Sequence, residues 1–86
     1  MYRLILSKKA SKFLEDFSKS DRKLFGQFIS ALEVISEDPF IGKCLVGNLK
    51  GYLSYRVRDY RIIYEIENKD ISVYIEKIAH RKESYK

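Results

Sequence analysis

The sequence predicts an α+β domain in which a helical hairpin packs on one face of a small antiparallel sheet of about four strands. Two observations predict this class. The first half of the chain carries two apolar stripes at helical spacing, and the second half carries three segments in which apolar and polar residues alternate. The expected order of elements is β-α-α-β-β-β. An 86-residue chain with 45% hydrophobic and 34% charged residues suits one domain, spanning residues 1–86.

A short strand and a helix account for the first 20 residues. Residues 2–6 are mostly apolar, and Ser7, which follows them, is a good residue to cap the start of a helix. The helix then carries an apolar stripe at i, i+3, i+4 and i+7, made by Ala10, Phe13, Leu14 and Phe17.

A second helix completes the hairpin. Residues 18–20 interrupt the first stripe, and Ser20 is expected to cap the new helix. Pro39 disfavours helical backbone at the residue before it, so the helix should end at Asp38. The apolar stripe of this helix is made by Leu24, Phe28, Ala31, Leu32 and Ile35.

The second half of the chain predicts an antiparallel meander. Residues 40–51 contain three glycines and are expected to form a loop. Three strands should follow, at about 52–58, 60–67 and 71–79. Residues 80–86 are too polar for a core strand and are expected to trail along the edge of the sheet.

Strand alternation separates apolar from basic side chains in the first strand of this meander. Leu53, Tyr55 and Val57 share one face, whereas Arg56 and Arg58 share the other. We expect the helices to cover the apolar face and to leave the arginine face open to solvent or a ligand.

The charge of the chain favours an anionic partner on the sheet side. The net charge is +5, and residues 40–86 hold ten basic and six acidic residues, against seven and six in residues 1–39. The basic excess therefore lies in the predicted sheet and tail rather than in the helices. A basic surface with no such partner is the alternative.

The single cysteine, Cys44, excludes an internal disulfide. With no signal peptide and no apolar run of transmembrane length, we expect a cytoplasmic protein that does not bind a membrane. One His and one Cys are too few for a zinc site, so neither a metal nor another cofactor is expected.

Arg56, Arg58 and Arg61 are expected to converge near one hairpin. Like charges this close repel one another unless an anion or a carboxylate lies between them. Guanidinium groups stay charged, and their planar geometry matches phosphate oxygens. The alternative is a solvated charged face that is balanced by Glu65, Glu67 and Glu76.

The last residues add groups that suit RNA cleavage. His80 can exchange protons near neutral pH, Arg81 stands beside it, and Tyr85 can dock or stack on a base. In RNA, a 2′-hydroxyl can attack the adjacent phosphorus and leave a 2′,3′-cyclic phosphate and a 5′-hydroxyl. This reaction needs charge stabilisation, a base and an acid, but no metal. The sequence lacks the acidic cluster of two-metal nucleases, so a metal-independent reaction is expected.

Several segments together resemble the RelE-type toxins of the RelE/ParE toxin–antitoxin superfamily. The resemblance covers nearly the whole chain, including the early strand and the helical hairpin. Its motifs are Leu-Lys-Gly at 49–51, Tyr-Arg-Val-Arg at 55–58, Asp-Tyr-Arg-Ile-Ile-Tyr at 59–64 and His-Arg-Lys-Glu-Ser-Tyr at 80–85. The last two motifs are fairly specific in combination.

The resemblance implies a toxin that enters the ribosomal A site and cuts the bound mRNA codon. It also implies an antitoxin, RelB-like or of another type, that keeps the toxin silent. Arg61 would hold the scissile phosphate, Arg81 would stabilise charge or protonate the leaving 5′-oxygen, and Tyr85 would orient the nucleotide.

The resemblance also implies RNA-binding residues, which are Lys50, Arg56, Arg58 and Lys82. Arg56 and Arg58 stand where RelE-type toxins carry lysines, one of which is proposed as a base. Because arginine is a very poor base, either His80 takes the proton or catalysis is mainly electrostatic and geometric.

Three other functions stay open. A ParE-like member would share the fold, inhibit DNA gyrase and cut nothing, although Arg61, Arg81 and Tyr85 together favour a nuclease. A non-enzymatic module would bind RNA or the ribosome through the same arginines. A degenerate toxin would only bind its antitoxin.

Overall fold

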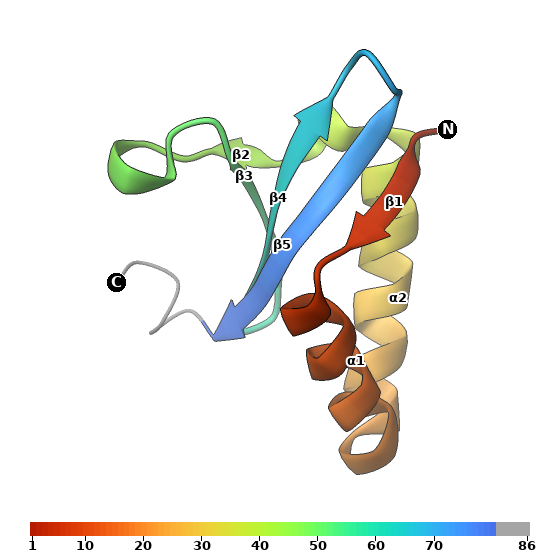
Figure 1. Ribbon diagram of the computed structural model, residues 1–86. Coiled ribbons are helices and arrows are strands. Elements are labelled where there is room, and N and C mark those ends of the chain that lie inside the picture. Colours follow the sequence, from red (N-terminus) through yellow and green to blue (C-terminus); the bar gives the residue numbers. More distant parts are fainter. Residues whose placement is uncertain (81–86) are drawn as a thin grey trace.

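The computed structural model describes residues 1–80, which form two helices and a five-stranded sheet (Figure 1). In chain order the elements are β1 (Arg3–Leu6), α1 (Lys8–Ser20), α2 (Arg22–Glu37), β2 (Lys43–Cys44), β3 (Leu53–Val57), β4 (Tyr60–Glu67) and β5 (Ser72–His80). Short 3₁₀ turns at Pro39–Ile41 and Gly47–Leu49 flank β2. The predicted α+β class and the helical hairpin are confirmed.

The sheet is mixed rather than antiparallel, with the strand order β1-β5-β4-β3-β2. β1 pairs with β5 in parallel, and the other neighbours are antiparallel. Parallel neighbours need a long connection, and here the chain from α1 to β4 supplies it. The predicted loop at 40–51 is also corrected, because Lys43 pairs with Ser54 and Cys44 pairs with Leu53.

The two helices begin at different kinds of cap. The Ser7 hydroxyl accepts the amide N–H of Ala10 at 3.1 Å, as predicted for α1. The prediction of Ser20 as the cap of α2 is wrong, since the Asp21 carboxylate accepts the amide of Leu24 at 3.1 Å. A carboxylate at a helix start also interacts favourably with the helix dipole. Neither helix within residues 1–80 is long and apolar enough to cross a membrane.

The core lies between the helices and one face of the sheet. Both predicted apolar stripes enter it, and Ala10, Phe28 and Ile35 are completely buried. Four aromatic rings pack edge to face or stacked at the hairpin end of the sheet, with centroids 4.7–5.7 Å apart: Phe13, Phe17, Phe28 and Tyr60. Such pairs stabilise a core beyond the area that they bury.

A buried tyrosine fixes the connection from α2 to the sheet. The Tyr64 hydroxyl donates to the Pro39 carbonyl at 2.8 Å, and the tyrosine side chain is completely buried. Burial raises the pKa of Tyr64 to about 12. A Cβ atom on Gly42 would collide with this hydroxyl, so only glycine fits there without a shift of the tyrosine ring.

Candidate functional site

The candidate site lies on the face of the sheet that α1 and α2 leave uncovered (Figure 1). We call it the second face. Strand register assigns to it the side chains of Lys43, Ser54, Arg56, Arg61, Ile63, Glu65, Tyr74, Lys77 and Ala79. The expectation of an open arginine face holds for Arg56, which is exposed, and in part for Arg61, which is half-buried.

Arg56 and Arg61 lie directly opposite each other on β3 and β4. The Cβ atoms of directly opposed residues are about 5 Å apart, and their side chains leave the sheet on the same side. The Arg56 Nε donates to the carbonyl oxygen of Arg58 at 3.1 Å. This hydrogen bond holds the Arg56 guanidinium group beside the hairpin turn. The structure therefore brings together two of the three arginines expected to converge.

Arg58 does not share the face of Arg56, so that prediction is wrong. β3 ends at Val57, and Arg58 begins the turn with a φ of +55°, which breaks the alternation of side chains. The Arg58 Nε donates to the Gln27 Oε1 on α2 at 2.8 Å, which turns this guanidinium toward the helical side.

His80 is also separated from Arg61. It pairs with Tyr60, whose ring packs among the helix aromatics, and the two rings meet edge to face at 5.3 Å. Arg61 pairs with Ala79 and so lies on the opposite face. The cause is a β-bulge, because Ile63 pairs with Lys77 whereas the next residue of β4 pairs with Ile75. Glu76 is the extra residue, and it reverses the alternation in the rest of β5.

The remaining predicted site residues divide into two groups. Lys50 is exposed in the loop before β3, at the end of that strand away from the hairpin and the arginine pair. Arg81, Lys82 and Tyr85 lie outside the described residues.

Sequence reasoning missed two further cations on the second face, Lys43 and Lys77. Lys43 pairs with Ser54 and Lys77 pairs with Ile63, one row of side chains away from the arginine pair. Strict alternation in β5 would have turned Lys77 toward the helices, and only the bulge brings it here. The Ser54 hydroxyl in this row is buried and has no hydrogen-bond partner among residues 1–80.

Acidic and phenolic groups occupy the other end of the second face. Glu65 pairs with Tyr74. The Glu65 carboxylate raises the pKa of Tyr52, and burial and the Glu76 carboxylate raise this pKa further. Cations near the hairpin and carboxylates at the opposite end polarise this face. An anionic ligand is therefore attracted to the hairpin end.

Residues 1–80 contain no group of three or more His, Cys, Asp or Glu side chains that could hold a metal ion. On the second face, the charged groups nearest the hairpin are instead the guanidinium groups of Arg56 and Arg61 and the ammonium group of Lys77. Such donors bind phosphate oxygens and stabilise negative charge that develops on them.

A family model supplies the widest comparison. The model described as the ParE toxin of the type II toxin–antitoxin system parDE matches residues 4–85. Among curated protein sequences no significant match is found.

Solved structures of several toxins are similar to this chain. The RelBE2 toxin–antitoxin complex from Mycobacterium tuberculosis matches with a TM-score of 0.79 and 26% identity over 93% of this chain and 98% of that chain. The YoeB-YefM complex from Staphylococcus aureus matches with a TM-score of 0.78 and 20% identity, over 93% and 97% of the two chains. The YoeB/ParE toxin from Agrobacterium tumefaciens matches with a TM-score of 0.81 and 17% identity, over 91% and 96%. The last two likenesses bear on the fold alone.

Proposed function

The chain belongs to the family of ParE toxins of type II toxin–antitoxin systems, within the RelE/ParE superfamily, and we propose that it is a ribosome-dependent mRNA endonuclease. One observation carries the nuclease assignment. Arg56 and Arg61 are direct neighbours on the face of the sheet that no described helix covers. Two arginines at directly opposed positions favour an anion between their guanidinium groups, and a phosphodiester offers two non-bridging oxygens for that purpose.

The proposed reaction is an in-line attack of the 2′-oxygen on the adjacent phosphorus. The bond from phosphorus to the 5′-oxygen breaks, so the products carry a 2′,3′-cyclic phosphate and a 5′-hydroxyl. The 2′-hydroxyl loses its proton to a base, and the leaving 5′-oxygen gains one from an acid. No metal is required, because the arginines stabilise the charge that develops on the phosphoryl oxygens.

The positions of Arg61 and Arg56 suit these residues to hold the scissile phosphate. The resemblance to RelE-type toxins assigns two further roles, in which Arg81 stabilises the leaving oxygen and Tyr85 stacks on the nucleotide. Lys43 and Lys77 join Lys50 and Lys82 in binding the RNA backbone. His80 packs on the helical side of the sheet, which favours catalysis that is mainly electrostatic over catalysis that depends on this imidazole.

We also propose an antitoxin as the protein partner and the ribosomal A site as the place where mRNA is cut. The RelBE2 relative is a toxin–antitoxin complex, which supports the first partner. The basic hairpin end of the second face supports the second, since ribosomes and mRNA are polyanions. Both partners imply a cytoplasmic protein.

Induced expression in cells, with primer extension on abundant mRNAs, tests this function. We expect growth arrest and new in-frame 5′ ends that disappear in Arg61→Ala. Arg22→Ala is the matched control, because it removes an exposed arginine from α2 and leaves the second face intact. Arrest without new 5′ ends would reject the nuclease assignment.

A ParE-like gyrase inhibitor is the second candidate function, and the description of the matching family favours it. A supercoiling assay with purified DNA gyrase separates the two. Inhibition that persists in Arg61→Ala, with no cut mRNA, would support the gyrase assignment.

A further inference from the structure

A row of aromatic and acidic side chains crosses the second face at the end away from the hairpin. We call it the tyrosine row, and it comprises Tyr52 before β3, Glu65 on β4 and Tyr74 on β5. Glu65 pairs directly with Tyr74. Continued by one position, the register of β3 and β4 places Tyr52 opposite Glu65.

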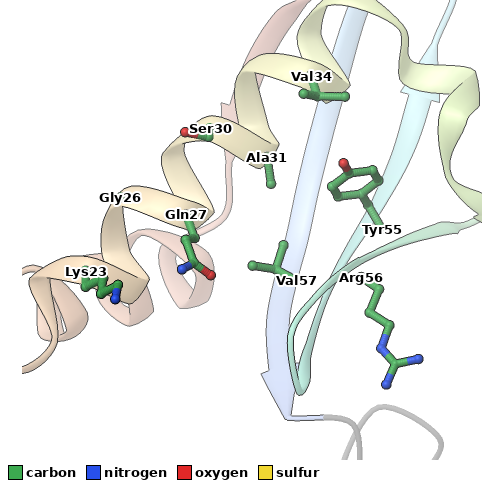
Figure 2. Close-up of a pocket in the computed structure, with 9 residues that line it drawn as sticks. All are labelled: Lys23, Gly26, Gln27, Ser30, Ala31, Val34, Tyr55, Arg56 and Val57. Carbon is green, nitrogen blue, oxygen red and sulfur yellow. The ribbon is translucent and has the colours of Figure 1, made fainter.

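The side chain of Tyr52 leaves the sheet on the second face. The Leu45 amide donates to the Tyr52 carbonyl at 3.0 Å, so the ladder between β2 and β3 continues to this residue. Figure 2 shows Tyr55 lying across from α2 and Arg56 directed away from the helix, and alternation puts Tyr52 on the side of Arg56. The Glu65 carboxylate is the largest cause of the raised pKa of Tyr52, which places the two groups near each other.

The two phenols of the tyrosine row are spaced to hold one planar base between them. Tyr52 and Tyr74 belong to the two strands that flank β4, and the backbones of these strands are about 10 Å apart. Both tyrosines are half-buried, and Glu65 lies between them. Ile5, which is 42% exposed, pairs with Tyr74 and extends the row with apolar area. Proteins commonly bind the bases of single-stranded RNA by stacking them on aromatic side chains.

Glu65 is the hydrogen-bond acceptor of the tyrosine row. It is exposed and makes no ion pair within residues 1–80, so both carboxylate oxygens can accept from a ligand. Among the RNA bases, guanine alone presents two adjacent N–H donors on its Watson–Crick edge, at N1 and N2. Adenine and cytosine present an amino group beside an acceptor, and uracil presents one N–H between two carbonyl oxygens. A carboxylate therefore matches guanine best.

The tyrosine row is continuous with the cationic part of the second face. Lys43 and Lys77 lie one row away, about 7 Å along the strands, and the pair of Arg56 and Arg61 lies one row further. An RNA strand whose phosphates contact these cations can therefore place a neighbouring base over the tyrosine row. A cationic ligand fits less well than a neutral base, because the lysines would repel it.

We infer that the tyrosine row is a base-binding subsite that selects guanine in the RNA strand, close to the scissile phosphate. Tyr52 and Tyr74 stack on the base, and the Glu65 carboxylate accepts from its N1–H and N2–H groups. This inference rests on the proposed function, because it takes RNA as the ligand of the second face. Stacking alone tolerates every base, so Glu65 is the residue that supplies specificity.

The first experiment titrates the purified full-length chain with guanosine 5′-monophosphate and, as the matched ligand, adenosine 5′-monophosphate. The two nucleotides share ribose and phosphate and differ only in the base. We expect the backbone amide NMR signals of Tyr52, Glu65 and Tyr74 to shift, and the guanine nucleotide to bind about fivefold or more tightly than the adenine nucleotide. Equal affinities, or shifts confined to the arginine and lysine rows, would overturn the inference.

Glu65→Gln tests the acceptor with little change of shape. The glutamine amide keeps one acceptor oxygen and adds a donor, so the preference for the guanine nucleotide should be lost. Glu33→Gln removes an exposed carboxylate from α2 and should keep the full preference. Both glutamates are exposed, so neither substitution disturbs the core. A preference that persists in Glu65→Gln would overturn the inference.

Tyr52→Leu tests the stacking. It should weaken the binding of both nucleotides by about fivefold or more, because each lost base–aromatic stack reduces affinity for any base. Tyr55→Leu is the matched control, since Tyr55 is also half-buried but lies on the side of α2 (Figure 2). Undiminished binding in Tyr52→Leu would contradict the proposed subsite.

The outcome is distinguishable from a failure of the proposed function. Nucleotide binding is measured without ribosomes, so a chain that cuts no mRNA still shows the preference for guanine. Equal binding of the two nucleotides by a chain that does cut mRNA would reject the subsite alone. A capped lysine tripeptide that shifts the signals of the tyrosine row, when neither nucleotide does, would assign the row to a basic protein segment and reject the RNA base.

Discussion

Replacement of Tyr64 by phenylalanine tests what holds α2 to the sheet. The Tyr64 side chain is 0% exposed, and its hydroxyl donates to the Pro39 carbonyl at 2.8 Å. The variant loses this hydrogen bond and leaves a buried acceptor without its donor, which costs about 1–3 kcal/mol. In a domain of this size each 1 kcal/mol lowers the melting temperature by about 4–8 °C. We therefore expect Tyr64→Phe to melt at least about 4 °C below the wild type near neutral pH.

Ionisation of the Tyr64 hydroxyl should make the difference in stability between the wild type and Tyr64→Phe depend on pH. Burial raises the pKa of Tyr64 from 10.0 to about 12 in the folded protein. Below about pH 10 the phenol is protonated in both states, and its full stabilisation is present. Between these two values only the unfolded state loses the proton, so stability falls as pH rises, by about 1.4 kcal/mol at about pH 11. Phenylalanine cannot ionise, so the variant lacks this loss.

Urea denaturation of the wild type and Tyr64→Phe at about pH 8 and about pH 11 measures the effect as a difference between two proteins. The difference in free energy of unfolding between the wild type and Tyr64→Phe should be smaller by about 1.4 kcal/mol at the higher pH. Tyr74→Phe is the matched control, because Tyr74 is a half-buried tyrosine on the second face. Its free energy of unfolding should not differ from that of the wild type by a comparable amount. If the free energy of unfolding of Tyr64→Phe differs from that of the wild type by the same amount or more at about pH 11, the reasoning is refuted.

Three further outcomes are expected. Gly42→Ala should lower the free energy of unfolding by about 1–3 kcal/mol, because its Cβ collides with the buried tyrosine hydroxyl; an unchanged urea midpoint would contradict this. Asp21→Ala should lower the free energy of unfolding by about 1 kcal/mol, because Asp21 caps α2, and Ser20→Ala should lower it much less. Equal losses of stability in urea denaturation would reject Asp21 as the cap. In a ribosome cleavage assay, Arg61→Ala should slow cutting by about 10²–10³. His80→Ala should slow it by less than about tenfold, because the imidazole packs on the helical side; the opposite order would make His80 the base.

The sequence by itself determined the helical hairpin, the meander and the basic hairpin between β3 and β4. These features follow from local periodicity, because apolar residues at a spacing of 3.6 or 2 mark which face of an element is buried. Local sequence also predicts three details: the Ser7 cap, the end of α2 before Pro39, and the proximity of Arg56 to Arg61. Each depends on residues that are near one another in the chain.

The tertiary structure alone decided the features that depend on distant partners. The parallel place of β1 beside β5 follows from packing across the whole chain, and no local pattern contains it. The bulge at Glu76 exchanges the faces of Lys77 and His80, because one extra residue reverses every side chain that follows. Arg58 leaves the arginine face because its turn has a positive φ and its guanidinium meets Gln27, 31 positions earlier in the chain. Periodicity assigns a face only while the register is unbroken, and here pairing between strands breaks it.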